Sequence, residues 1–70
     1  MSINLKDITS IERYCLTLVA EGQTTREIAI FLTMAEGRIE HHLNSIETKL
    51  GAASRVEAVA IALKHNFLQL

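Results

Sequence analysis

The sequence predicts an all-α domain of four helices that contains a helix-turn-helix and occupies residues 1–70 as a single domain. First, a 70-residue chain with 49% hydrophobic residues and no proline is typical of one compact helical unit. Second, Ser or Thr stands three residues before Glu, the capping-box arrangement that begins many helices. This pairing occurs at Thr9 and Glu12, Thr24 and Glu27, Thr33 and Glu36, and Ser54 and Glu57. Third, apolar residues recur every three or four positions after each pair, the period of an amphipathic helix.

The first predicted helix runs from about Ser10 to Glu21, and Gly22 ends it at the left-handed position that follows many helices. The second runs from Thr25 to about Leu32. The expected buried residues are Ile11, Cys15, Leu18 and Val19 in the first helix, with Leu16 at the edge, and Ile28, Ala29 and Leu32 in the second. Each helix is therefore expected to pack one face on a shared core.

The third predicted helix follows a turn of about three residues and reaches Lys49 or Leu50, where Gly51 ends it. The fourth runs from about Arg55 to His65. The expected buried residues are Ile39, Leu43, Ile46 and Leu50 in the third helix and Ala58, Val59, Ala62 and Leu63 in the fourth. Asn66 is expected at the C-terminal position of the fourth helix, with residues 67 and 68 folded back on the core.

Composition excludes several classes of function. A chain this short has little room for a catalytic cleft, and no catalytic constellation is visible, so we expect no enzyme. His41 and His42 diverge by about 100° on a helix and cannot converge on one metal ion, and neither a metal site nor a cofactor is expected. One cysteine, no secretory signal and no apolar run near about 20 residues indicate a cytoplasmic protein without a membrane segment. A net charge of −1 means that any DNA binding must depend on where the charges lie.

The connection between the second and third helices carries the functional prediction. Two helices joined by so short a turn cross steeply, so the second of them can enter a major groove. With its apolar residues on the core, the third helix presents a polar face of Gly37, Arg38, His41, Asn44, Ser45 and Thr48, flanked by His42 and Lys49 on one edge and Glu40 on the other. Arg can fork to guanine, Asn can pair with adenine, and Ser or Thr can contact bases or phosphates. Arg26, Lys49 and Arg55 lie near helix ends, where phosphates would run.

The sequence resembles the LuxR/GerE-type helix-turn-helix of quorum-sensing and NarL/FixJ-type regulators. The resemblance covers nearly the whole chain and rests on these motifs: Ile8-Thr9-x-x-Glu12, Ala20-x-Gly22-x-Thr24-x-Arg26-Glu27-Ile28-Ala29-x-x-Leu32, Ile39-x-x-His42-Leu43, Ile46-x-x-Lys49-Leu50-Gly51-Ala52 and Ser54-Arg55-x-Glu57-Ala58-Val59-x-x-Ala62. Its block from Lys49 to Val59 is the specific part. Sigma-factor region 4 is a weaker match, because it lacks the fourth helix.

The resemblance implies a transcriptional regulator that binds pseudo-palindromic promoter DNA as a homodimer, with RNA polymerase as a further candidate partner. With the polar face above, it gives Arg38, Glu40, His41 and Asn44 as candidate base contacts. The candidate phosphate contacts are Thr24, Arg26, His42, Ser45, Lys49 and Arg55. The candidate dimer residues on the fourth helix are Val56, Ile61 and Leu63.

This chain departs from the family where the third helix begins. The family usually has Ser-x-x-Thr-Val-Lys there, and this chain has residues 35–40 as Ala-Glu-Gly-Arg-Ile-Glu. Because Ala35 cannot cap, either Thr33 and Glu36 begin the helix earlier or the first turn is frayed around Gly37. Glu40 could accept from a cytosine amine but also repels phosphates, so we expect modest DNA affinity or an unusual site. The alternative is a helix-turn-helix-derived protein-interaction module with weak or no DNA binding.

Overall fold

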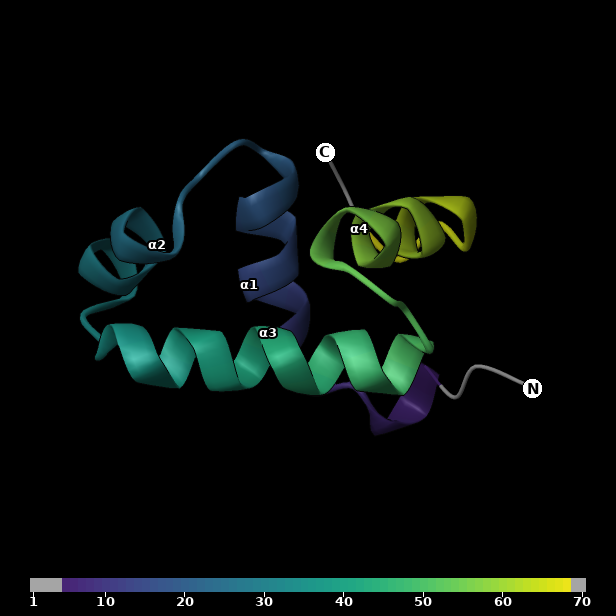
Figure 1. The fold of residues 1–70 in the computed structure, drawn as a ribbon, viewed down its shortest axis with the longest axis horizontal. Helices are drawn as coiled ribbons and strands as arrows, with labels where there is room; N and C mark the ends of the chain where they lie inside the picture. The colour runs from purple at the N-terminus through teal and green to yellow at the C-terminus, as the bar shows by residue number, and fades with distance from the viewer. Residues whose placement is uncertain (1–4, 69–70) are drawn as a thin grey trace.

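The computed structural model describes residues 5–68, and every regular element in that range is helical. A short 3-10 helix, η1 (Leu5–Asp7), precedes α1 (Ser10–Ala20), α2 (Thr25–Leu32), α3 (Glu36–Leu50) and α4 (Arg55–Lys64). In Figure 1, α3 runs along one edge of the molecule, and α1, α2 and α4 all lie on the same side of it. The predicted all-α fold with four α-helices is confirmed, and η1 is an element that the sequence pattern did not predict.

Side-chain caps explain where α1 and α2 begin. At α1, Thr9 Oγ1 accepts from the Glu12 amide at 3.2 Å, and Glu12 Oε1 accepts from the Thr9 amide at 2.9 Å. The same reciprocal pair joins Thr24 and Glu27 at α2, at 3.1 and 2.8 Å. Both capping boxes are confirmed, and each satisfies two backbone N–H groups that the first turn leaves without a partner.

The cap of α4 forms only in part. Ser54 Oγ accepts from the Glu57 amide at 3.1 Å, as the capping box requires. The Glu57 carboxylate, however, accepts from the Ala53 amide at 3.0 Å rather than from Ser54 itself. The predicted start of α4 is therefore right, while the reciprocal half of its predicted cap moves one residue upstream.

The predicted capping box of Thr33 and Glu36 is wrong. Thr33 adopts a left-handed conformation with φ of 55° and closes the end of α2, where the Met34 amide donates to the Ala29 carbonyl at 2.9 Å. A residue in that conformation cannot also take the extended backbone of an N-cap. Ala35 is the N-cap of α3 and makes no side-chain hydrogen bond. The first turn, including Gly37, is nevertheless helical, so the alternative of a frayed start is also not observed.

The core forms where the four helices meet. Its buried members are Cys15, Leu16, Leu18, Ile28, Ala29, Ile39, Leu43, Ile46, Leu50, Ala58, Ala62 and Leu68. All four residues predicted to face inward from α3 are buried. Asn66 has a φ of 54°, so the predicted C-terminal turn is confirmed, and the chain beyond it folds back with Leu68 in the core.

Two predictions about core positions are wrong. Leu16 was expected at the edge of the buried face of α1, yet it is completely buried, because α1 is packed by α3, α4 and α2 together. Leu63 was expected in the buried stripe of α4 and is 42% exposed. The buried side of α4 consists of Ala58 and Ala62, whose small side chains let the helix pack closely, and Leu63 lies about 100° further round.

Thr33→Gly is expected to raise the free energy of unfolding by about 1 kcal/mol. A β-branched residue in the left-handed region carries a steric cost that glycine does not have, and that relief outweighs the extra entropy of glycine in the unfolded chain. Urea denaturation measures the change. Asn66→Gly is the matched control, because Asn tolerates this conformation and should gain less. A Thr33→Gly variant less stable than the parent would contradict the prediction.

Candidate nucleic-acid interface

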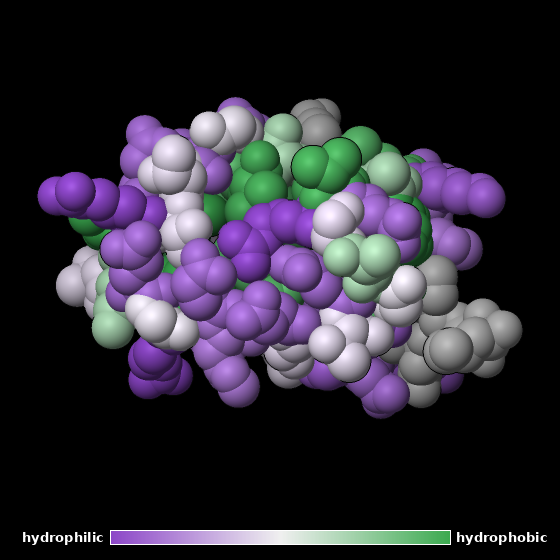
Figure 2. All heavy atoms as spheres, viewed as in Figure 1, coloured by the Kyte–Doolittle hydropathy of each residue, from purple (hydrophilic) through white to green (hydrophobic). Residues whose placement is uncertain are grey.

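The outward face of α3 is the surface that the sequence singles out. Ile39, Leu43 and Ile46 hold one side of the helix in the core. The exposed side chains on the other side are Arg38, His41, Asn44 and Thr48, at spacings of three, three and four residues. Figure 2 shows that hydrophilic side chains predominate along α3 in this view. A shallow groove on this face is lined by His41, Asn44, Ser45, Thr48 and Lys49.

The α2–α3 pair has the geometry of a helix-turn-helix. Only three residues, 33–35, separate the two helices. Ile39 is fully buried and Ala29 nearly so, and both belong to the same core cluster. The small Ala29 side chain suits a close crossing of α2 and α3. The pair therefore fixes the direction in which the outward face of α3 points.

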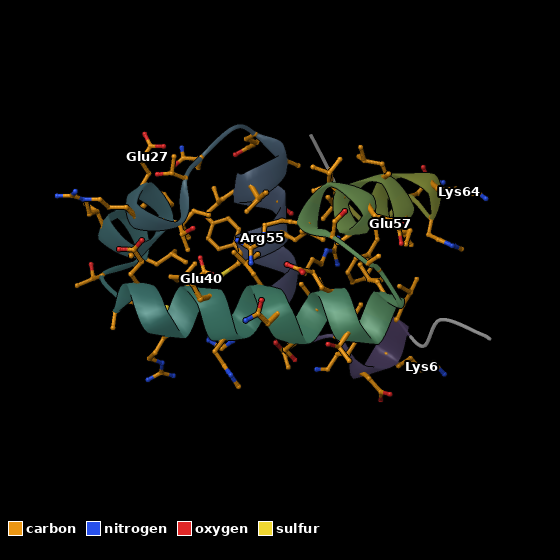
Figure 3. The ribbon with its side chains drawn as sticks, in the orientation of Figure 1. Lys6, Glu27, Glu40, Arg55, Glu57 and Lys64 are labelled. Carbon is orange, nitrogen blue, oxygen red and sulfur yellow. The ribbon has the colours of Figure 1, made fainter. Side chains whose placement is uncertain are left out.

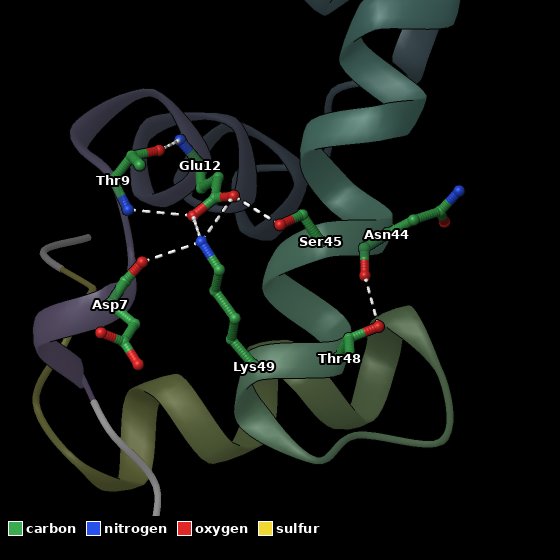
Figure 4. Close-up of polar contacts among 7 residues, drawn as sticks. All are labelled: Asp7, Thr9, Glu12, Asn44, Ser45, Thr48 and Lys49. Atoms are coloured by element: carbon green, nitrogen blue, oxygen red, sulfur yellow. Dashed lines mark hydrogen bonds and ion pairs between the residues drawn. The ribbon is translucent and has the colours of Figure 1, made fainter.

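One flank of this face is tied to α1 by a buried carboxylate. Glu12, only 4% exposed, accepts a hydrogen bond from Ser45 Oγ at 2.6 Å. Lys49 Nζ donates to both Glu12 oxygens, at 2.8 and 3.0 Å, and to the Asp7 carbonyl at 2.8 Å. Figure 4 shows these contacts converging on Glu12 from α3 and from the turn before α1. We call Glu12, Ser45 and Lys49 the Glu12 cluster.

The Glu12 cluster keeps its carboxylate ionised. Burial alone would raise the pKa of Glu12, but the hydrogen bonds from Lys49, Ser45 and the Thr9 amide, together with the Lys49 charge, outweigh burial and lower that pKa to about 2. Glu12 also acts on its neighbour Cys15. Burial, and then the Glu12 charge, raise the pKa of that thiol, so Cys15 is a buried and protonated core residue.

The opposite flank of α3 is tied to α4 by Arg55. Its Nε donates to Glu47 Oε2 at 2.8 Å, and its Nη2 donates to Glu40 Oε2 at 3.2 Å and to Asn44 Oδ1 at 3.5 Å. The hydrogen bond from Arg55 lowers the pKa of Glu40 most, and one from Thr25 adds to it. We call Arg55, Glu40, Asn44 and Glu47 the Arg55 cluster.

The two clusters leave few cations unpaired near α3. The predicted phosphate contacts Lys49 and Arg55 are each bound to carboxylates. In contrast, Arg26 and Arg38 are exposed and form no ion pair among residues 5–68. Glu36 is also exposed near this face. Because it lies in the first turn of α3, the partial positive charge of the helix N-terminus stabilises its carboxylate. The positive surplus on this surface is therefore small.

The remaining predicted contacts lie around the same surface. Thr24 is exposed, but its hydroxyl already accepts from the Glu27 amide. His42 and Ser45 are half-buried. The His41 and His42 rings meet edge to face with centroids 6.0 Å apart. In the part of the chain that the structure describes, no three His, Cys, Asp or Glu side chains are placed to hold a metal ion.

Two members of these clusters were missed as site residues. Glu12 was interpreted only as part of a cap, and Glu47 was given no role. Glu12 pairs with Lys49, 37 residues away along the chain, and Glu47 pairs with Arg55, eight residues away across the α3–α4 turn, so both pairs depend on how the helices pack. One signal was available for Glu12, which lies three and four residues before Cys15 and Leu16 and therefore on the buried side of α1.

The family described as bacterial regulatory proteins, luxR family (GerE), matches residues 6–62. The chain belongs to this family. Its type of domain is the DNA-binding helix-turn-helix of transcriptional regulators, which confirms both the predicted resemblance and the predicted absence of enzymatic function.

Individual relatives agree with this assignment. Transcriptional activator protein AhyR of Aeromonas hydrophila is 34% identical over 61 residues, which are 87% of this chain and 24% of that protein. Transcriptional regulatory protein YdfI of Bacillus subtilis (strain 168) is 37% identical over 67 residues, 96% of this chain and 32% of that protein. The solved structure of the transcription factor GerE superposes with a TM-score of 0.83 at 26% identity, covering 99% of this chain and 97% of GerE. This chain thus spans about a quarter to a third of the curated relatives named here.

Proposed function

We propose that this LuxR-family domain binds double-stranded promoter DNA in a sequence-specific manner by placing α3 in the major groove. The observation that carries the proposal is the line of exposed Arg38, His41 and Asn44 on a helix whose other side is fixed in the core. A groove about 12 Å wide accepts one helix. The short α2–α3 turn leaves α3 at the edge of the molecule, where it can enter such a groove (Figure 1).

The proposed base contacts are Arg38, Glu40, His41 and Asn44. A guanidinium such as that of Arg38 suits the O6 and N7 atoms of guanine. Glu40 keeps 44% of its side chain exposed beside Arg55, and a carboxylate there can accept from the N4 amine of cytosine. The charge of Arg55 offsets the repulsion that Glu40 would otherwise exert on nearby phosphates.

The proposed phosphate contacts lie on the flanks of α3 and at the start of α2. They are Thr24, Arg26, His42, Ser45, Lys49 and Arg55. Arg26 has an exposed charge available for a phosphate. Lys49 would share its ammonium between Glu12 and the DNA, so its contribution to affinity is smaller than that of an unpaired lysine. We therefore expect modest affinity for one half-site.

We further propose that two domains dimerise through α4 on two half-sites about one helical turn apart. Val56, Ala60 and Leu63 are exposed and spaced four and three residues apart, so they form an apolar stripe on α4. Val56 is 80% exposed and Leu63 42% exposed, so a second domain could cover both. Ile61, also predicted in the dimer interface, lies about 140° from Val56 and packs partly against the core. The proposed dimer therefore rests on the stripe of Val56, Ala60 and Leu63.

The cellular location that we propose follows from the proposed DNA partner. Promoter DNA and RNA polymerase lie in the bacterial cytoplasm, which we propose as the location, with RNA polymerase as a second partner. Among residues 5–68, the longest helix has 15 residues and no helix meets the length and apolarity that crossing a bilayer requires.

Arg38→Ala is expected to weaken DNA binding about tenfold, because one guanidinium contact to a base edge or phosphate is lost. Fluorescence anisotropy with a palindromic GC-containing duplex measures the dissociation constant at several salt concentrations. Lys64→Ala is the matched control, since it removes the same charge from an exposed residue in the last turn of α4 that is not among the proposed contacts. If two domains dimerise on DNA, they should bind less tightly to a duplex whose two half-sites have been moved apart by half a helical turn.

The same titration distinguishes the alternative function. DNA binding that releases counterions must weaken steeply as salt rises. A protein-interaction module would retain no DNA at any salt concentration. That result, or equal binding by the parent and by Arg38→Ala and Asn44→Ala variants at low salt, would overturn the proposed function.

A further inference from the structure

Arg55 connects the start of α4 to three side chains of α3. Glu40, Asn44 and Glu47 are spaced four and three residues apart, so they share one side of the helix. Arg55 contacts all three of them through Nε and Nη2. In Figure 3, the labelled Arg55 and Glu40 side chains point toward each other on the same side of α3. One guanidinium thus holds two of the proposed base contacts at once.

The partners of Arg55 hold the guanidinium in a defined orientation. Its contact with Glu47 is short at 2.8 Å, and only 19% of the Glu47 side chain is exposed. Glu40 provides a second carboxylate at 3.2 Å. Because the guanidinium is planar and is bonded to two carboxylates, its N–H groups point in fixed directions. Its third contact, with Asn44, is therefore directed by the two ion pairs.

This arrangement determines which end of the Asn44 amide faces the solvent. A guanidinium carries only hydrogen-bond donors, so the atom of Asn44 that faces Arg55 must be the carbonyl oxygen Oδ1. The amide nitrogen Nδ2 then points away from Arg55. Recognition of adenine by Asn uses both atoms, because Oδ1 accepts from N6 while Nδ2 donates to N7. With Oδ1 directed at Arg55, Nδ2 is the end of the Asn44 amide that faces the groove, so Asn44 presents a donor there.

We propose that Arg55 is a positioning residue that sets base specificity by orienting Asn44 toward hydrogen-bond acceptors. The favoured base at the position that Asn44 contacts is then guanine, which presents the acceptors O6 and N7 in the major groove, rather than adenine. This inference rests on the proposed function, because it requires α3 to lie in that groove. Glu40 belongs to the same cluster and occupies the place of the family's usual Lys, so this chain gives Arg55 a carboxylate partner at that position.

Selection from a duplex library with a randomised core tests the inference. The parent chain is expected to prefer guanine at one position of each half-site, and Asn44→Ala should lose the preference at that position alone. Arg55→Lys keeps the charge but lacks the fork that reaches Glu47 and Asn44 together. It should shift the preference at the same position toward adenine by about tenfold, because Oδ1 is released. Arg13→Lys, an equal change of residue at the exposed cation–π contact with Phe67, is the control and should leave the preference unchanged.

The outcomes separate this inference from the proposed function. Circular dichroism first establishes that each variant is folded. If no variant and no parent chain binds the library at low salt, the proposed function fails. If the parent binds and Asn44→Ala identifies a position, but Arg55→Lys leaves the base preference there unchanged, the inference is wrong and the proposed function stands. A preference of the parent chain for adenine at that position would also overturn the inference.

Discussion

Glu12→Ala is expected to lower the free energy of unfolding by about 3 kcal/mol at pH 7. The substitution removes hydrogen bonds to Ser45, Lys49 and the Thr9 amide, all made by one carboxylate that is 4% exposed. Lys49 keeps 30% of its side chain exposed and can turn to water, so losing its hydrogen bonds to Glu12 costs little free energy. Most of the cost falls on the part-buried Thr9 amide and Ser45 hydroxyl, which lose their partners.

A matched control separates this burial effect from simple capping. Glu27 occupies the same position in the capping box of α2, with an exposed side chain and a bond only to the Thr24 amide. Glu27→Ala should therefore cost clearly less than Glu12→Ala, because water can replace its one bond to the Thr24 amide. Urea denaturation of both variants gives the two values. Equal losses would show that Glu12 acts as a cap alone and that its cluster contributes nothing.

The same carboxylate makes stability depend on acid. The folded pKa of Glu12, about 2, lies below its ordinary value of 4.5, so the stabilisation is fully present above pH 4.5 and is lost as the pH falls toward 2. The difference corresponds to about 3 kcal/mol. Glu12→Gln removes the titration, so its stability should change less than that of the parent across this window. Denaturation at a series of pH values measures both slopes.

Much of the fold could be predicted because its signals are local. The caps at Thr9, Thr24 and Ser54 fix three helix starts, and the four apolar residues of α3 fix its buried side. The errors concern competition between elements. Thr33 fits a cap by its sequence, but the short turn needs it to end α2. Leu63 fits the apolar stripe predicted for α4, but α4 packs on the core through Ala58 and Ala62.

The candidate site was predictable only as a surface. A helical wheel suffices to place Arg38, His41 and Asn44 on the outward face of α3. It gives no information on Lys49 bound to Glu12, 37 residues away, or on Arg55 bound to Glu40, 15 residues away. Such pairs depend on how the helices pack, which no single periodic pattern contains. The wheel therefore overestimated the free positive charge on this surface, because it treated every cation as available to phosphates.

Ile39→Ala is expected to lower the free energy of unfolding by about 3 kcal/mol and to weaken DNA binding of the fraction that remains folded. Ile39 is completely buried in the core cluster that also holds Ile28 and Ala29 of α2, and its truncation leaves a cavity that the packed neighbours can fill only partly. The residue also lies between Arg38 and Glu40, two of the proposed base contacts. A looser crossing should therefore displace the first turn of α3, and with it these side chains.

Ile30→Ala is the matched control, since Ile30 belongs to the neighbouring helix and is 71% exposed. Its stability should change by less than about 0.5 kcal/mol. Urea denaturation gives the stability of both variants, and anisotropy at a temperature where both are folded gives their affinity for the duplex. A folded Ile39→Ala variant with parental affinity would show that the crossing supports only the core. A loss of affinity beyond the unfolded fraction would show that the direction of α3 is itself part of the recognition of DNA, because no group that touches DNA has been removed.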